Sequence, residues 1–146
     1  MRNVLLLSAL VATSAAAQLP GFSRRGPQPA PVVQNPADLL RADFAAQSGG
    51  TTVYFGAGSA ILSPQGKGVL TAQASWLRLH PDVAVRIEGY GDGSDTRDHA
   101  LAMGARRANE VRDYLLLLGV PSAQVSAMSW GKERPRPGSA VTTIVQ

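Results

Sequence analysis

Segments typical of strands and of helices alternate along residues 51–145 of this 146-residue chain. The segments expected are strand 51–55, helix 64–79, strand 83–90, helix 96–118, strand 125–130 and strand 141–145. This β-α-β-α-β-β order predicts a mixed α/β (α+β) fold with the helices packed on one face of a sheet. Because helices connect successive strands, part of that sheet should be parallel.

Residues 83–90 carry the clearest strand pattern. Apolar and other side chains alternate here, with Val83, Val85 and Ile87 on one face and Ala84, Arg86 and Glu88 on the other. An alternation with a period of two is typical of a strand that is covered on one side only.

The first of the two long helices should begin at Ser63-Pro64. Serine is a favoured N-cap, and proline at the first helical position lacks only an N–H that would have no partner there. His80-Pro81 should end this helix near Leu79.

The second long helix is expected to be capped by Asp95, with Asp98 three residues on in a variant of the capping box, and to end at Gly119. Its apolar residues recur at intervals of three and four, which predicts one buried stripe. The stripe consists of Leu101, Gly104, Ala108, Val111, Leu115 and Leu118.

The first residues read as an export signal. Arg2 precedes the apolar run 4–12, and Ala15-Ala16-Ala17 supplies a small-residue cleavage site, so residues 1–17 are expected to be a cleavable signal peptide. The run is too short for a mature membrane span, and the alternative is a buried N-terminal helix. The chain has no cysteine, so we expect neither disulfides nor a lipid-modified N-terminal cysteine.

Residues 18–50 are expected to form a proline-rich linker followed by a short helix. Five prolines fall within residues 18–36, and the helix is expected over 37–47. The linker either extends as polyproline II, which would let an envelope protein bind it at a distance from the domain, or is a disordered tail. The third part, residues 51–146, is the expected folded domain.

Charge and composition favour a binding protein over an enzyme or a nucleic-acid binder. Without residues 1–17 the formal net charge is +3, and the basic residues are spread out rather than gathered in the dense stripe that nucleic acids require. The only histidines are His80 and His99, and neither pairs obviously with a nucleophile or a metal ligand. We therefore expect no catalysis, no metal and no cofactor.

Three motifs, followed by a closing segment, resemble one known family. The motifs lie at 53–62, at 85–92 (Val-Arg-Ile-Glu-Gly-Tyr-Gly-Asp) and at 101–120, and the closing segment is Ser-Trp-Gly-Lys-Glu-Arg-Pro at 129–135. In this order they resemble the OmpA-like domain found at the C-terminus of outer membrane protein A and in peptidoglycan-associated lipoprotein. The resemblance implies a periplasmic module, associated with the outer membrane or the cell wall, that binds peptidoglycan without catalysis.

The same resemblance implies the site. In the family an aspartate after the second strand and an arginine in the next helix hold the zwitterionic end of diaminopimelate in the stem peptide, and these positions correspond to Asp92 and Arg107. Tyr90 fits the histidine or tyrosine that precedes the loop. The family usually has asparagine where Ala100 stands, so a domain that kept the fold as a structural or protein-interaction module and lost peptidoglycan affinity stays open as an alternative.

The residue types alone make the pair chemically plausible. One fixed carboxylate and one guanidinium, which can form a bidentate fork, match the ammonium and carboxylate of an amino-acid head group. At 100° per residue, Arg107 should lie at the edge of the buried stripe and Arg106 in solvent. The alternative is that Arg107 only snorkels at the core boundary and that Asp92 only forms a turn.

Overall fold

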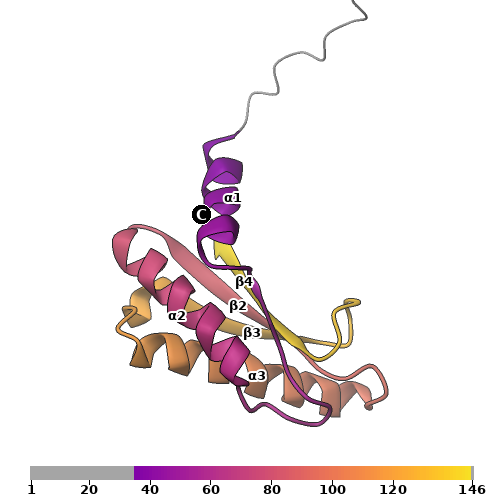
Figure 1. Ribbon diagram of the computed structural model, residues 1–146. Helices are drawn as coiled ribbons and strands as arrows, with labels where there is room; N and C mark the ends of the chain where they lie inside the picture. The colour runs from indigo at the N-terminus through magenta and orange to yellow at the C-terminus, as the bar shows by residue number, and fades with distance from the viewer. Residues whose placement is uncertain (1–34, 146) are drawn as a thin grey trace, which may run out of the picture. The chain divides into compact units, whose positions relative to one another are not determined.

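The computed structural model describes residues 35–145 (Figure 1). The expected signal peptide and most of the expected linker lie outside these residues. The elements in chain order are α1 (Pro36–Gln47), β1 (Thr52–Tyr54), α2 (Pro64–Leu79), β2 (Ala84–Tyr90), α3 (Arg97–Leu117), a 3-10 turn (Ser122–Gln124), β3 (Val125–Gly131) and β4 (Ser139–Val145). The predicted β-α-β-α-β-β order and the short preceding helix are therefore confirmed.

The four strands form one mixed sheet in the order β1-β4-β2-β3. β2 and β3 are parallel, as the helical crossover between them requires, whereas β4 runs antiparallel to both β1 and β2. The last strand thus inserts between the first two, a pairing that the sequence pattern alone does not reveal.

α2 and α3 cover one face of the sheet, as predicted (Figure 1). The alternation of β2 places Val85 and Ile87 in the core against these helices, where Leu77 and Leu115 are also fully buried. Arg86, Glu88 and Tyr90 point to the opposite face, which we call the outer face because α2 and α3 leave it uncovered.

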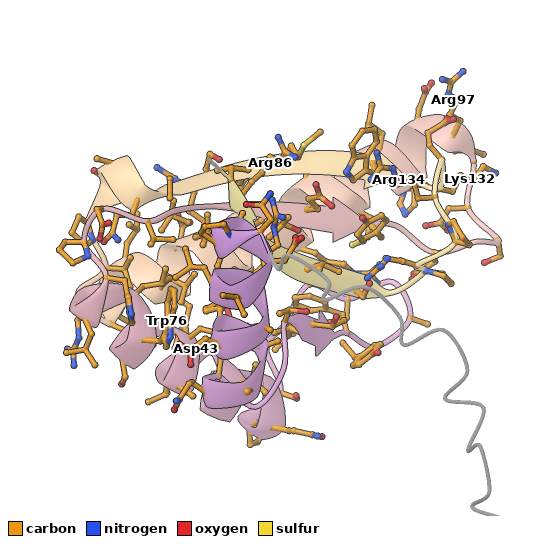
Figure 2. All side chains as sticks on the ribbon, turned by 90° about the horizontal axis from the view of Figure 1, so that it is seen from above. Asp43, Trp76, Arg86, Arg97, Lys132 and Arg134 are labelled. Atoms are coloured by element: carbon orange, nitrogen blue, oxygen red, sulfur yellow. The ribbon has the colours of Figure 1, made fainter. Side chains whose placement is uncertain are left out.

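α1 packs against α2 through aromatic side chains. The Phe44 and Trp76 rings meet edge to face with centroids 5.0 Å apart, and the Trp76 Nε1–H donates to Asp43 at 2.8 Å (Figure 2). The buried ring of Phe44 makes α1 part of the same core as α2.

The caps of the two long helices agree only partly with the sequence prediction. Ser63 caps α2 by accepting the Gly66 N–H at 3.0 Å, as predicted. The predicted Asp95 cap of α3 is wrong: Thr96 accepts the His99 N–H at 3.3 Å, and α3 begins one residue later than expected. The physical reason is that Asp95 still belongs to the preceding turn, where its N–H donates to the Asp92 carbonyl at 3.3 Å.

The buried stripe of α3 is rotated from the predicted one at its N-terminal end. Leu101, predicted to be buried, is 50% exposed, while Ala100 and Met103 are buried in its place. The backbone of Gly91 packs directly on Ala100, and a Cβ at Gly91 would meet the Ala100 backbone. Tertiary contact with this glycine, rather than side-chain hydrophobicity, therefore decides which side of the helix faces inward.

Two glycines let α3 approach β2 closely. A Cβ at Gly89 would overlap the backbone of Gly104, and one at Gly104 would overlap Ser129 Oγ and the Gly89 carbonyl. Backbone approach of this kind is open only to residues without a Cβ. It brings the middle of α3 over the end of β2, and this position determines what Arg107 can reach.

Candidate functional site

Three loops meet at one end of the sheet, which we call the loop end: residues 55–63, 91–96 and 132–138 (Figure 1). Backbone hydrogen bonds join them. Gly138 N–H donates to the Gly91 carbonyl at 3.1 Å and the Gly138 carbonyl accepts from Phe55 N–H at 2.8 Å. The loops therefore form one connected structure around the side chain of Arg107.

The Arg107 guanidinium is completely buried, hydrogen-bonds to loop 55–63 and to the end of β2, and forms an ion pair with Asp92. Its Nε donates to the Ser59 carbonyl at 2.8 Å, and one terminal nitrogen donates to the Tyr90 carbonyl at 2.8 Å. The other terminal nitrogen donates to the Gly56 carbonyl at 3.0 Å and lies 2.9 Å from Asp92 Oδ1. The guanidinium thus forms three hydrogen bonds to carbonyls and one ion pair, all within the protein.

Asp92 completes the pair from the loop after β2. Its Oδ2 accepts the Gly58 N–H at 2.7 Å, while Oδ1 faces Arg107, and the side chain is 18% exposed. The Gly58 hydrogen bond, followed by the hydrogen bond and charge of Arg107, lowers the pKa of Asp92, whereas partial burial opposes the shift. Asp92 is therefore a fixed anion with one side open to solvent.

The sequence prediction that Asp92 and Arg107 converge agrees with this geometry. Arg106 is exposed, as predicted, but Arg107 lies in the interior and not at the edge of the stripe. The difference arises because the carbonyls of Gly56, Ser59 and Tyr90 are acceptors inside the fold. Their hydrogen bonds offset the free-energy cost of removing the guanidinium from water.

Tyr90 takes a different position from the one expected of a ligand-contacting side chain. It is 1% exposed, and its hydroxyl donates to Glu88 Oε2 at 3.1 Å on the outer face, beside Arg86. Burial, and then the charge and hydrogen bond of Glu88, raise the pKa of Tyr90. The part of Tyr90 that reaches the Asp92–Arg107 pair is its backbone carbonyl.

Sequence reasoning missed the contribution of loop 55–63. Gly56, Gly58 and Ser59 act through backbone groups, so their side-chain types carry no direct signal of this role. The only sign in the sequence is the Gly56-Ala57-Gly58 pattern, which is typical of a loop. Gly58 has a φ of 61°, and this left-handed conformation favours glycine at the residue whose N–H holds Asp92.

The chemistry available at the pair is binding of a charged group. The Asp92 side chain is 18% exposed, so a ligand would reach it from the surface of the protein. Within the same residues, no cluster of three or more His, Asp or Glu side chains is arranged to hold a metal ion.

Comparison with known proteins assigns this fold to a family. The model of the OmpA family matches residues 54–143. The chain belongs to the OmpA family. The resemblance inferred from the motifs of the β2 and α3 segments is thereby confirmed.

The relatives of this OmpA family domain are similar in sequence over the same region. The peptidoglycan-associated lipoprotein of Rhizobium meliloti is 40% identical over 86 residues, which cover 59% of this chain and 49% of the relative. That of Pseudomonas aeruginosa is 40% identical over 94 residues, covering 64% of this chain and 55% of the relative. The chain thus spans about half the length of the curated relatives it matches.

Two solved structures have the same fold. The crystal structure of the peptidoglycan-associated lipoprotein from Burkholderia pseudomallei matches with a TM-score of 0.64 at 32% identity, over 66% of this chain and 92% of that one. The C-terminal domain of Helicobacter pylori MotB matches with a TM-score of 0.59 at 19% identity, over 64% of this chain and 83% of that one, and supports the fold alone. Within residues 35–145 no helix combines the length and hydrophobicity needed to cross a membrane.

Proposed function

We propose that this chain is a peptidoglycan-binding module of the bacterial envelope that acts by binding and not by catalysis. Its ligand is the diaminopimelate of the stem peptide. Membership of the OmpA family and similarity to proteins named peptidoglycan-associated lipoprotein support the proposal. The observation that carries it is the Asp92–Arg107 pair, in which a partly exposed carboxylate is fixed by a buried guanidinium at 2.9 Å.

In the proposed complex Asp92 binds the ammonium group of the ligand. Each of its oxygens accepts one hydrogen bond within the protein and retains a further lone pair, so the open side can accept from an ammonium. Its lowered pKa keeps it ionised at any pH that peptidoglycan encounters in the cell. A charge-assisted hydrogen bond of this type contributes about 1.5–3 kcal/mol.

We assign Arg107 two roles. In the conformation described, it positions Asp92 and loop 55–63, because all its partners belong to these segments and to the end of β2. Its positive charge lies behind the Asp92 carboxylate and favours binding of the ligand carboxylate beside Asp92. Tyr90 contributes to the site by holding Arg107 through its backbone carbonyl.

A single stem peptide would bind weakly through so few contacts, and retention on the wall would depend on the many copies that the polymer presents. The expected signal peptide would place the module in the periplasm, where the linker joins it to an envelope protein.

Retention on purified sacculi tests this function. Asp92→Asn keeps the size and acceptor oxygen of the side chain but removes its charge, and should weaken retention by roughly 10-fold to 100-fold. Asp98→Asn, in the exposed first turn of α3, removes the same charge at the same end of the molecule and should bind as the wild type does. Sacculi with lysine in place of diaminopimelate lack the second carboxylate and should retain all three proteins poorly.

The rival function is a structural or protein-interaction domain without peptidoglycan affinity. The complete burial of Arg107 favours it, since a guanidinium whose partners all lie within the fold needs no ligand to explain it. Wild-type protein that stays in solution with diaminopimelate sacculi would establish the rival. Retention that Asp92→Asn leaves unchanged would refute the proposed site while leaving wall binding in place.

A further inference from the structure

The outer face of the sheet carries a second surface at the loop end, distinct from the Asp92–Arg107 pair. We call it the loop-end patch and define it by Tyr54, Trp130, Lys132, Arg134 and Arg136. Strand register places Tyr54 on the outer face, at the edge strand β1, and Arg136 lines a hollow together with Tyr54. Trp130 lies at a bulge of the other edge strand, β3, and lines a hollow with Lys132 and with Leu101 of α3. In Figure 2, Arg134 and Lys132 gather at one end of the molecule, and Arg86 lies farther along the same side.

The patch presents arginines in a pre-organised form. Arg134 lies over the Trp130 ring, with its guanidinium carbon 3.6 Å from the ring centroid, and its N–H groups form no hydrogen bond within residues 35–145. Pro135 and Pro137 restrict the backbone on both sides of Arg136, and the Arg136 N–H closes a tight turn onto the Arg134 carbonyl at 2.8 Å. A stiff loop loses less conformational entropy when its side chains bind a partner.

The cations of the patch are not neutralised by nearby acids. Glu133 pairs with Arg97 at 2.9 Å, Asp92 pairs with Arg107, and Glu88 pairs with Arg86 at 3.2 Å. Asp95 faces His99, and Lys132 reaches only the Asp95 backbone carbonyl, at 2.6 Å. Within residues 35–145, Arg134 and Arg136 form no ion pair, so the patch is a net positive surface.

We propose that the loop-end patch docks on an anionic lipid bilayer, with Arg134, Arg136 and Lys132 binding headgroup phosphates and with Trp130 and Tyr54 at the level of the headgroups. Planar guanidinium groups match phosphate oxygens bidentately. Tyrosine and tryptophan, with an apolar body and a polar end, are the side chains enriched at membrane interfaces, and Tyr54 is 72% exposed on a face without a helical cover. This combination of aromatic rings with cations favours a lipid surface over a soluble polyanion.

The docking would hold the domain against a membrane through side chains other than Asp92 and Arg107. It goes beyond wall binding and does not depend on it. A domain that engages both partners would connect membrane and peptidoglycan through two different surfaces of one fold.

Vesicle sedimentation of the full chain tests this inference. The measured quantity is the excess of binding to vesicles of phosphatidylglycerol mixed with phosphatidylcholine over vesicles of phosphatidylcholine alone, which subtracts any uncharged contribution from the rest of the chain. The double variant Arg134→Gln/Arg136→Gln should lower this excess roughly 30-fold, since each basic residue near an anionic surface contributes about fivefold in affinity. Added salt should abolish the excess.

The matched control is Lys67→Gln/Arg106→Gln, which removes the same charge from exposed positions on the helical layer and should keep the full excess. Equal losses in both double variants, or no loss in either, would overturn the proposal. So would soluble polyphosphate binding as tightly as the vesicles with the same dependence on Arg134 and Arg136. Because the vesicles contain no peptidoglycan, failure here leaves the proposed wall function untouched.

Discussion

Replacing Arg107 by methionine would remove the group on which the loop end is built while keeping a long, flexible side chain in its place. Three buried or partly buried carbonyls, those of Gly56, Ser59 and Tyr90, would lose their donor. Each such loss costs about 1 kcal/mol or more. Asp92 would also lose a charged partner, although its exposed side can be hydrated, which limits that part.

We therefore expect Arg107→Met to lower the free energy of unfolding by about 4 kcal/mol, within the range for breaking a buried ion pair from one side. Urea unfolding followed by circular dichroism measures this value, provided that the slope of free energy against urea stays unchanged. Arg106→Met, at the exposed neighbouring position, is the control and should stay within about 0.5 kcal/mol of the wild type.

The difference in the free energy of unfolding between the wild type and Arg107→Met should depend on pH in a definite direction. The pKa of Asp92 is lowered in the folded state, so its contribution to stability is present above the unfolded pKa of about 3.9 and is lost as the pH falls through the folded pKa. The variant keeps the Gly58 hydrogen bond but loses the contribution of Arg107. The stability gap between wild type and Arg107→Met should hence narrow as the pH drops below about 4.

Two results would refute this reasoning. A loss of less than about 1 kcal/mol in Arg107→Met would mean that the buried hydrogen bonds contribute little and that water replaces the guanidinium easily. A gap that widens in acid would mean that the Asp92 carboxylate is not stabilised by Arg107.

Three further changes test the packing that positions the site, each by urea unfolding. Gly89→Ala should lower the free energy of unfolding by about 3 kcal/mol, because the new Cβ would meet the Gly104 backbone. Gly93→Ala, the control, has open space around it and should change the free energy of unfolding by less than about 0.5 kcal/mol. Equal effects of the two changes would contradict the close approach of α3 to β2. Ser63→Ala should cost about 1 kcal/mol through loss of the α2 N-cap, and an unchanged midpoint would show that water replaces the cap. Phe44→Ala should cost about 3–5 kcal/mol, and near wild-type stability would mean that α1 lies outside the cooperative core.

Local chemistry made much of the fold predictable. The Ser63-Pro64 start of α2, the alternation of β2 and the glycine that ends α3 each depend on residues close together in the chain. Gly119, for example, has a φ of 92°, as a residue after the end of a helix requires. Signals of this kind are complete within a few residues, so they can be recognised without knowledge of the tertiary structure.

The features that were missed depend on contacts between distant segments. Leu101 is exposed because the Gly91 backbone packs on Ala100, and this pairing of a loop with a helix has no local signature. The insertion of β4 between β1 and β2 is likewise a matter of long-range register. Helical periodicity gave the position of Arg107 around the α3 axis but could not reveal the carbonyls that draw it inward.

Because Arg107 is buried, substituting it cannot separate a ligand-binding role of the Asp92–Arg107 pair from a structural role. An arginine that holds three carbonyls and a carboxylate is needed for the fold whether or not a ligand binds, so its presence alone favours neither function. Asp92 differs, because part of its carboxylate faces solvent. The hydrogen bond from the Gly58 N–H requires only an acceptor oxygen and not a negative charge. An amide at position 92 keeps one acceptor oxygen for the Gly58 N–H, but its NH2 group then faces the Arg107 guanidinium, so it removes the partner of Arg107 as well as the charge that an ammonium ligand would bind. Loss of wall retention in Asp92→Asn therefore assigns the pair to binding only if urea unfolding shows a stability close to that of the wild type; a loss of retention together with a large loss of stability would instead assign the pair to the fold.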